Sequence, residues 1–459
     1  MIRSRSRRAP PLRRNATTPG HAAFPAHPLQ SVTITGLGQH GDGLASTPEG
    51  ESLYVPGTVP GDRVTVRRTG GSASQGWIAQ VVTLDAAGPD RSAPACPHYG
   101  ACGGCALQHM RADAVQTWKQ TRLRQALHRA GFDPPAEPMA WISAPPASRR
   151  RATVALLRDG ATVRLGFRGR ASHQIVDLDV CPVLSPALTR LFPGLRQGLA
   201  PFLPPAGPIA GRRLDLALTV CDNGVDLVIR GSLTDDLALR EGLADLGRGL
   251  DLARLSWQPD ETAPPRILIA FRPPEVRFAG LRVVLPPGGF LQATEPTQQA
   301  MIAAIRAAVQ PLAGRPTLDL FAGLGAFTLP LGLEGPTHGV ESDPAAVAAL
   351  SAALRQPGAP GAVSVENRDL YRRPFTADDL QRFAAVVMDP PRAGAHDQAR
   401  HLAMAPASVE RLVMVSCNPA TLARDLACLH GGGWRLGTVL GVDQFLWSPH
   451  LEAVVCLWR

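Results

Sequence analysis

Leu318-Asp319-Leu320-Phe321-Ala322-Gly323-Leu324-Gly325 is the stretch that decides the fold class, because an apolar strand runs directly into a glycine-rich turn. Glycines in such a turn let the backbone approach a ligand closely. Two later runs end in a similar way, Val386-Val387-Met388 before Asp389-Pro390-Pro391-Arg392 and Val413-Met414-Val415-Ser416 before Cys417-Asn418-Pro419. Open α/β sheets bind ligands at the carboxyl ends of their strands. We therefore expect Cys417 beside a nucleotide-type cofactor pocket.

Helix-like and strand-like segments alternate from residue 295 to residue 459. The expected helices cover 296–309 and 344–355, and the expected strands cover 317–321, 338–341, 363–365, 384–388, 412–416 and 453–457. Such alternation is typical of a parallel sheet with helices on both faces. We predict a doubly wound, Rossmann-like α/β domain over residues 291–459.

The amino-terminal part of the chain predicts further domains. Short strands separated by glycine turns indicate an OB-like β-barrel over residues 30–90, a fold that often binds single-stranded nucleic acid but can also serve in packing alone. Residues 91–290 predict a mixed α+β domain, with a helix over 115–130 and a hairpin that turns at Asp222-Asn223-Gly224. Residues 1–29 are rich in Arg, Pro and Ala and predict a disordered basic arm.

The composition is that of a soluble globular protein, with 45% hydrophobic and 19% charged residues. The net charge of +9 suits a polyanionic partner such as RNA. Lys119, however, is the only lysine among the 47 lysines and arginines, and this skew is also typical of a G+C-rich genome. No apolar run reaches the ~18–20 residues of a membrane helix, and the amino terminus lacks the apolar centre of a secretory signal. We expect a cytoplasmic protein without membrane contact.

Three of the eight cysteines lie close together, in the spacing Cys96-x5-Cys102-x2-Cys105, and Cys181 offers a fourth ligand. A disulfide scaffold would be shorter and richer in cysteine. Four thiolates can hold a [4Fe–4S] cluster or zinc. The absence of two paired CxxC knuckles favours the iron–sulfur cluster.

We expect this cluster to be structural, because its ligands lie far in sequence from the other candidate site residues. Gly103 and Gly104 would leave backbone N–H groups free to point at the sulfur atoms. The three remaining cysteines outside the Cys417 motif fall in apolar runs and are predicted as core: Cys221, Cys428 and Cys456.

Glu341 ends the predicted strand 338–341, where a carboxylate can accept hydrogen bonds from ribose hydroxyls. Asn367 and Asp369 follow the next strand, near the expected adenine edge. A nicotinamide cofactor is disfavoured, because the G-x-G-x-x-G cradle for a pyrophosphate is absent. S-adenosylmethionine has no pyrophosphate, and Asp389-Pro390-Pro391 at the end of the fourth strand favours it.

Cys417 and Glu452 together fit methyl transfer to carbon 5 of a uracil. Carbon 5 is a poor nucleophile until a thiolate adds at carbon 6, and a base must afterwards remove the carbon 5 proton. The reaction therefore needs a cysteine and a carboxylate on opposite edges of the ring, and Glu452, just before the last strand, is the natural base. Methyltransferases that act on amino nitrogens often carry an aromatic residue after Asp-Pro-Pro. Arg392 stands there instead and suits a phosphate or a uracil carbonyl.

These motifs together resemble those of the bacterial uracil-5 RNA methyltransferases, and in particular the ribosomal RNA enzymes with a TRAM barrel and an iron–sulfur cluster. The resemblance covers residues 30–459. It implies Cys417 as nucleophile and Glu452 as general base. It implies a [4Fe–4S] cluster on Cys96, Cys102, Cys105 and Cys181. It implies S-adenosylmethionine contacts from Gln292, Phe321, Glu341, Asn367 and Asp389.

The resulting hypothesis is a monomeric, S-adenosylmethionine-dependent enzyme that makes 5-methyluridine in 23S ribosomal RNA. The barrel and the cluster favour ribosomal RNA, because simpler transfer-RNA members of the family lack both. One alternative is the same chemistry on transfer RNA. Another is a non-catalytic RNA-binding or RNA-folding protein, since Ala326 stands where related enzymes often have Asn. A third is methylation of an amino nitrogen, and Arg392 argues against it.

Overall fold

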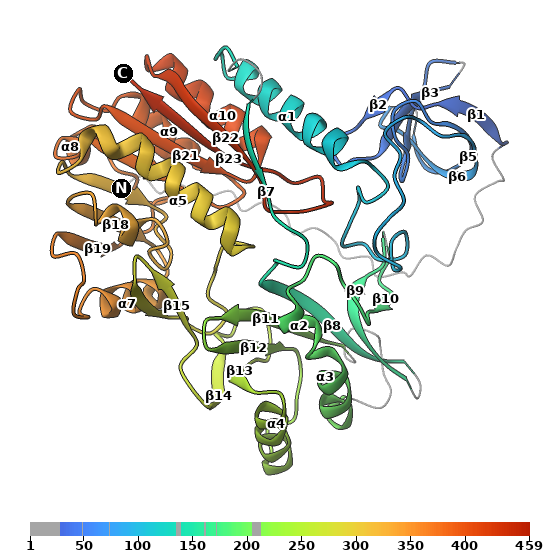
Figure 1. Cartoon of the computed structure of the whole chain (residues 1–459), viewed down its shortest axis with the longest axis horizontal. Coiled ribbons are helices and arrows are strands. Elements are labelled where there is room, and N and C mark those ends of the chain that lie inside the picture. Colours follow the sequence, from blue (N-terminus) through green and yellow to red (C-terminus); the bar gives the residue numbers. More distant parts are fainter. Residues whose placement is uncertain are drawn as a thin grey trace, which may run out of the picture. The chain divides into compact units, whose positions relative to one another are not determined.

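Figure 1 shows the computed structural model, which describes residues 28–47, 49–72, 74–134, 139–159, 162–170, 172–203 and 213–459. Residues 1–27 of the predicted basic arm lie outside these ranges. The described chain forms two compact units. Residues 28–38 and 42–89 make up the first unit, and residues 39–41 and 90–459 make up the second.

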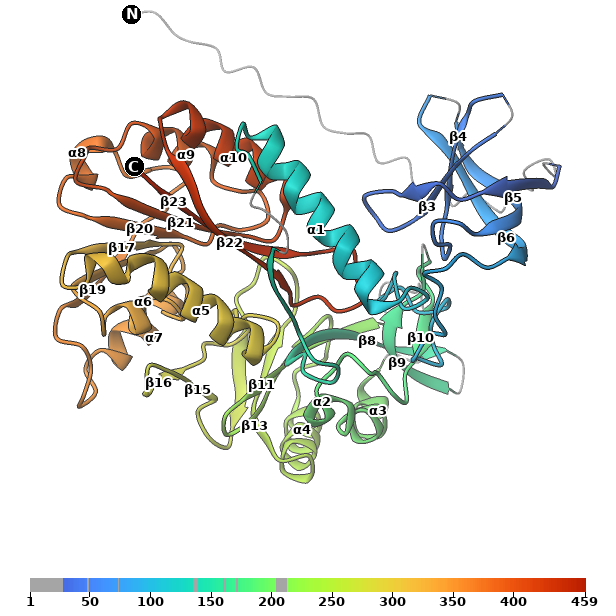
Figure 2. The same ribbon diagram turned by 45° about the horizontal axis from the view of Figure 1, so that its top comes forward.

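The first unit is a six-stranded sheet with the strand order β1-β5-β6-β4-β3-β2 (Figure 2). Its strands are β1 (Gln30–Thr33), β2 (Gly36–Leu37), β3 (Gly43–Ser46), β4 (Ser52–Val55), β5 (Arg63–Ser72) and β6 (Gly76–Ala86). Val64 and Val66 on β5 are buried and alternate with more exposed neighbours, so one face of the sheet forms an apolar core. The register between β5 and β6 shifts three times, and such bulges bend a sheet strongly. The short strands expected over residues 30–90 are confirmed.

The central part of the second unit is a seven-stranded sheet with the order β10-β9-β8-β11-β12-β13-β14. Its strands are β8 (Arg151–Asp159), β9 (Thr162–Arg168), β10 (Ile175–Asp177), β11 (Arg213–Cys221), β12 (Gly224–Arg230), β13 (Leu252–Gln258) and β14 (Arg266–Ala270). The predicted hairpin is confirmed, because β11 and β12 pair from Asp215 opposite Arg230 to Cys221 opposite Gly224. A separate hairpin follows, made of β15 (Glu275–Phe278) and β16 (Leu281–Val284).

Short helices cover this central sheet. They are α2 (Pro186–Thr189), α3 (Phe192–Leu199), η1 (Ala200–Phe202) and α4 (Leu237–Gly249). Leu239, Leu243 and Leu246 on α4 recur at the helical period and are buried in the same apolar cluster as Leu195 of α3.

The carboxyl-terminal sheet has eight strands in the order β19-β18-β17-β20-β21-β23-β22-β7. They are β7 (Ala140–Ser143), β17 (Thr317–Leu320), β18 (Thr337–Glu341), β19 (Val363–Asn367), β20 (Ala385–Met388), β21 (Arg411–Ser416), β22 (Arg435–Asp443) and β23 (Glu452–Trp458). The strands from β19 to β21 are parallel, whereas β23 is antiparallel to both of its neighbours. The expectation of a wholly parallel sheet was therefore wrong, and the sheet is mixed.

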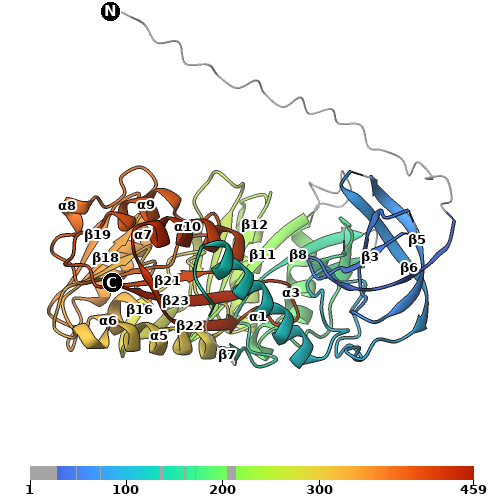
Figure 3. The same ribbon diagram turned by 90° about the horizontal axis from the view of Figure 1, so that it is seen from above.

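Helices cover both faces of this sheet, as expected (Figure 3). Leu412 and Met414 on β21 belong to the apolar cluster of α1, α9 and α10, whereas Val413 and Val415 belong to the cluster of α5. The helices are α1 (Ala112–Arg129), α5 (Glu295–Val309), η3 (Gln310–Leu312), α6 (Thr328–Leu331), α7 (Pro344–Ala353), α8 (Ala377–Leu380), α9 (His396–Ala403) and α10 (Pro419–Gly431). Full burial of a Leu, Met or Val side chain, such as those on β21, stabilises the fold by about 1.5–3 kcal/mol relative to exposure. In the described parts of the chain, no helix has the length and apolarity to cross a membrane.

Two elements from before the central sheet join the carboxyl-terminal sheet. Strand β7 pairs in parallel with β22, with Asp443 opposite Ser143, and helix α1 packs against α10. Neither β7 nor β22 was predicted from the sequence. Their pairing matters for the site, because it places α1 beside the segment that joins β22 to β23.

Candidate active site and cysteine pocket

The carboxyl end of β18 forms one half of the candidate site. The Glu341 carboxylate accepts a hydrogen bond from the Gly323 N–H at 2.9 Å, and its other oxygen accepts from the N–H groups of Ser342 and Asp343 at 2.6 and 2.8 Å. The Asn367 amide donates to the main-chain carbonyl of Glu341 at 3.1 Å. The structure thus brings together Glu341, Asn367 and the glycine-rich turn.

The turn after β17 holds a strained backbone. Phe321 has φ +63°, a left-handed conformation that a bulky side chain rarely adopts and that clusters at functional sites. Its ring centroid lies 5.8 Å from that of Tyr371. A Cβ atom on Gly323 would meet nothing within 4 Å, whereas one on Gly325 would lie 2.5 Å from Leu350. Gly325 therefore permits close packing of α7, and Gly323 faces open space.

The other half of the site is a network of buried amides and carboxylates. Gln292 Nε2 donates to Asp389 Oδ2 at 3.0 Å. Gln444 Nε2 donates to Gln292 Oε1 at 3.0 Å and to Glu452 Oε2 at 2.5 Å. All four residues are largely buried, and Glu452 is only 4% exposed. The predicted cofactor residues Gln292 and Asp389 and the predicted base Glu452 are thus members of one connected group.

Cys417 lies at the same edge of the sheet. Strand β21 ends at Ser416, which pairs with Ala453 on the antiparallel strand β23. Cys417 therefore follows β21 at the point where Glu452 begins β23. Asn418 next to it caps helix α10 by accepting from the Ala420 N–H at 3.1 Å. The two residues that the sequence analysis paired are neighbours in the fold.

Burial determines the electrostatics of this group. Burial, and then the nearby Asp389, raise the pKa of Glu452 from 4.5 to about 8. Burial likewise raises the pKa of Asp389 to about 7. The pKa of the Cys417 thiol rises to about 11, mainly by burial and then by the charges of Glu452 and Asp389, while Arg392 opposes the shift. The arrangement places a thiol, a carboxyl group with a raised pKa and a cation that favours the thiolate at one edge of the sheet.

Sequence reasoning missed two members of the site. Gln444 directly follows Asp443, the last residue of β22. Two consecutive polar residues at the end of a strand are a signal that could have found it. Asp319 is fully buried inside β17, and its Oδ2 accepts from Thr328 Oγ1 at 2.5 Å. Its Oδ1 is buried and has no hydrogen-bond partner in the described residues. Burial raises the pKa of Asp319 to about 7, and the carboxylates of Asp389 and Glu341 add to the shift.

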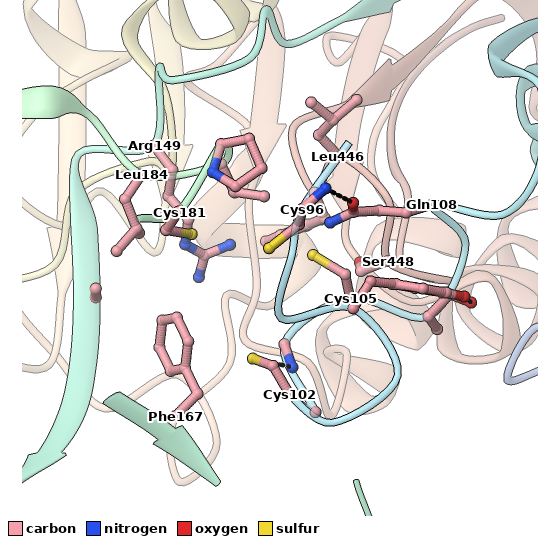
Figure 4. A pocket seen from close by; sticks show the side chains of 18 of the residues that line it. Cys96, Cys102, Cys105, Gln108, Arg149, Phe167, Cys181, Leu184, Leu446 and Ser448 are labelled. Atoms are coloured by element: carbon pink, nitrogen blue, oxygen red, sulfur yellow. Dashed lines mark hydrogen bonds between the residues drawn. The ribbon is translucent and has the colours of Figure 1, made fainter. Parts of the chain in front are cut away.

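The four predicted cysteine ligands line one cavity (Figure 4). Its volume is about 620 Å³, and Figure 4 shows the sulfur atoms of Cys96, Cys102, Cys105 and Cys181 facing a common space. None of the four forms a disulfide. The Gly104 N–H donates to Cys102 Sγ at 3.4 Å, as expected. The expectation for Gly103 was wrong, because its N–H donates to the Arg168 carbonyl.

Four thiols that line one cavity are the donor type that a [4Fe–4S] cluster or a zinc ion takes. Within the described ranges, no three His, Cys, Asp or Glu side chains come close enough together to hold one metal ion. A four-iron cluster takes one thiolate at each of its corners, so its ligands stand farther apart than those of a zinc ion. Residues 445, 446 and 448–450 also line the cavity. The cysteines are far from Glu452 in sequence, but their cavity borders the segment that leads to it.

The chain is similar in sequence to known RNA methyltransferases. Residues 365–459 match the family model described as tRNA (Uracil-5-)-methyltransferase, and residues 29–69 match that of the TRAM domain. An RNA methyltransferase of Brucella suis is 40% identical over 430 residues, which cover 93% of this chain and 97% of the relative. The 23S rRNA (uracil(1939)-C(5))-methyltransferase RlmD of Halomonas elongata is 36% identical, over 93% of this chain and 89% of the relative.

The chain belongs to the RNA uracil-5 methyltransferase family. The fold agrees with this membership. The crystal structure of Pyrococcus abyssi tRNA (uracil-54, C5)-methyltransferase with S-adenosyl-L-homocysteine superimposes with a TM-score of 0.70 at 22% identity, over 93% of this chain and 99% of that chain. The match of residues 29–69 to the TRAM domain confirms the TRAM domain that the sequence analysis expected at the amino-terminal end.

The raised pKa of Glu452 predicts a pH-dependent stability. The native state holds the proton of Glu452 up to about pH 8, whereas the unfolded chain loses it near 4.5, so rising pH destabilises the native state between these values. Replacing Glu452 with Gln removes this pH-dependent destabilisation, because Gln does not titrate. It also removes the repulsion between the charges of Glu452 and Asp389. We expect the unfolding temperature of Glu452→Gln to rise relative to wild type from pH 5 to pH 8 and then to level off. Differential scanning calorimetry checks this.

The exposed Glu261 provides the control. Glu261→Gln should show a constant difference from wild type over the same range. An equally constant difference for Glu452→Gln would show that the carboxyl titrates normally in the folded protein.

Proposed function

We propose that the protein methylates carbon 5 of a uridine in 23S ribosomal RNA, with S-adenosylmethionine as methyl donor, as a monomer in the cytoplasm. The observation that carries the proposal is the pairing of β21 with β23, which sets Cys417 beside Glu452 at the edge occupied by Gln292 and Asp389. The choice of RNA is supported by the 36% identity to the Halomonas elongata 23S rRNA enzyme, and by the TRAM barrel and cysteine pocket.

The residues at the carboxyl edge fit S-adenosylmethionine. We assign its binding to Gln292, Phe321, Glu341, Asn367 and Asp389. The open space over Gly323 leaves room for a ligand against the backbone, and Glu341 lies beside it. The bound molecule would supply an electrophilic methyl group on a sulfonium.

Cys417 and Glu452 perform the two remaining tasks. The Cys417 thiolate adds to carbon 6 of the uracil, which makes carbon 5 nucleophilic enough to take the methyl group. Glu452 then removes the proton from carbon 5. The electron pair of that C–H bond re-forms the C5–C6 double bond and expels the thiolate. A carboxylate with a raised pKa is a stronger base than an exposed one, which suits removal of a proton from carbon.

We propose that Cys96, Cys102, Cys105 and Cys181 hold a [4Fe–4S] cluster with a structural role. Their sulfur atoms face one cavity, and the Gly104 N–H already points at one of them. Zinc is the alternative occupant, and the absence of two paired CxxC knuckles in the sequence disfavours it.

Transfer RNA is the second candidate substrate. It is supported by the match of residues 365–459 to the tRNA (Uracil-5-)-methyltransferase family and by the fold similarity to the Pyrococcus abyssi enzyme. The non-catalytic alternative rests on Ala326 alone, whose side chain packs against the apolar cluster of Leu324 and Leu329.

Cys417→Ala should abolish both methyl transfer and the covalent protein–RNA adduct, because no other group adds to carbon 6. Glu452→Gln should form the adduct but release it at least ~100-fold more slowly, the lower end of the effect of a general base. Denaturing electrophoresis of protein incubated with labelled RNA measures both. Cys428→Ala, which alters a half-buried cysteine on α10, is the matched control and should retain turnover. Turnover by Cys417→Ala would instead favour methylation of an amino nitrogen.

Cys181→Ser should lose most of the bound iron and sulfide, because a cluster held at three corners is labile. Iron and sulfide analysis and the broad visible absorbance of the purified protein measure this. Cys428→Ser should keep the full content. Zinc in place of iron in the wild-type protein would contradict the cluster assignment and leave the methyl-transfer chemistry unaffected.

A deletion strain should lack one 5-methyluridine in 23S ribosomal RNA and retain those of its transfer RNA. Mass spectrometry of nuclease fragments from both RNAs measures this, and a plasmid copy of the gene should restore the modification. Loss from transfer RNA alone would replace the ribosomal substrate with the second candidate.

A further inference from the structure

Lys119 on helix α1 is both the only lysine of the chain and one of its most deeply buried side chains. Its ammonium lies 2.7 Å from Asp443 Oδ1, and both side chains are almost completely enclosed. Burial lowers the pKa of Lys119, and the Asp443 carboxylate opposes that shift. A buried ion pair is weak as a source of stability, because desolvation offsets the attraction. A specific geometric role would explain this pair better than a contribution to stability.

The ion pair fixes the backbone on both sides of Gln444. Asp443 Oδ1 also accepts from the Phe445 N–H at 3.2 Å, and Lys119 Nζ lies 3.5 Å from the Phe445 carbonyl oxygen. The Asp443 carbonyl accepts from the Ala144 N–H at 2.8 Å. Helix α1 and the residue after β7 therefore hold the chain immediately before and after Gln444.

The Gln444 amide can take only one orientation. Its Oε1 accepts from the Ala293 N–H at 3.0 Å, and a main-chain N–H is a donor only. The Nε2 group must then face the two oxygens Gln292 Oε1 and Glu452 Oε2. This in turn directs Gln292 Nε2 to Asp389. One Glu452 oxygen is thus committed to Gln444, so the other, Oε1, is the one that would receive the proton.

We propose that Gln444 is a positioning residue that aims the carboxylate of Glu452 at the carbon 5 proton, and that the Lys119–Asp443 pair holds Gln444 in place. This inference rests on the proposed role of Glu452. Gln444 contacts the base and a cofactor residue, and it acts through them on the reaction.

Gln444→Met keeps the length of the side chain but removes all three amide hydrogen bonds. We expect adduct formation at the wild-type rate, and a release of the carbon 5 proton that is about tenfold or more slower. A 23S transcript carrying tritium at carbon 5 of uridine reports proton removal as released tritium, and labelled S-adenosylmethionine reports methyl transfer. Because the Gln444 hydrogen bond lowers the pKa of Glu452, the pH profile of tritium release should also move to higher pH.

Gln398→Met is the matched control. Gln398 is equally buried on α9. Its Oε1 accepts a hydrogen bond from the Phe375 N–H at 2.8 Å, and its Nε2 donates to the Phe375 carbonyl at 3.1 Å. This variant should lose stability yet release tritium with the wild-type rate and pH profile. A wild-type rate and profile for Gln444→Met would overturn the proposal.

Lys119→Met tests the ion pair, with Arg254→Met as control. Arg254 and Asp226 form a similar buried pair at 2.8 Å within the central sheet. Both variants should unfold at lower temperature, but only Lys119→Met should slow tritium release and shift its pH profile. If Lys119→Met does not fold, Asp443→Asn provides the same measurement with a smaller expected effect. Equal kinetics for the Lys119 and Arg254 variants would limit the Lys119 pair to a structural role and refute this part of the proposal.

Glu452→Gln separates this inference from the function on which it rests. If Glu452→Gln accumulates adduct and Gln444→Met does not, the positioning role is wrong and the base assignment stands. If Glu452→Gln itself releases product normally, the base assignment is wrong.

Discussion

The antiparallel pairing of β23 with β21 is the constraint on which the rest of the site depends. A parallel sheet alone would bring the carboxyl ends of β17, β18, β20 and β21 together, and with them Glu341, Asp389 and Cys417. Glu452 begins a strand and does not end one. Only a reversed strand can bring it to that edge, and the pairing of Ser416 with Ala453 does so beside Cys417.

Burial of several acids at one edge has an energetic cost, and two glutamines reduce it. Asp319 and Glu452 are buried and Asp389 is largely buried, and this burial raises the pKa values of all three. Gln292 and Gln444 give hydrogen bonds to Asp389 and Glu452 without adding charge. A lysine or arginine in the same places would hold the carboxylates ionised at much lower pH and make them weaker bases. A neutral amide preserves basicity while it fixes orientation.

The cysteine pocket is lined by segments that lie far apart in the sequence. Its four cysteines come from the loop before α1 and from the segment after β10, and its wall includes residues 445, 446 and 448–450. The N–H groups of Ala106 and Leu107 donate to the carbonyl of Trp447 at 2.9 and 3.0 Å. A group bound there would brace the segment between Gln444 and Glu452 from one side, while helix α1 holds it from the other.

The sequence by itself determined most of the local elements and the choice of candidate residues. Local periodicity, the glycine turn and the Asn-Pro stop depend on neighbouring residues. The strand ends at Met388 and Ser416 could therefore be predicted to the residue, and the end of the strand expected over 317–321 to within one residue. Cys417 and Glu452 could be named as candidates for the same reason. The tertiary structure alone decided which distant segments meet. The pairing of β7 with β22 and of Lys119 with Asp443 joins segments hundreds of residues apart, and β23 reverses to pair with β21 across an intervening helix and strand. No local pattern encodes these partners. Gln444 was missed for that reason: its place in the site comes from Gln292 and Glu452, which only the folded sheet brings within hydrogen-bonding distance.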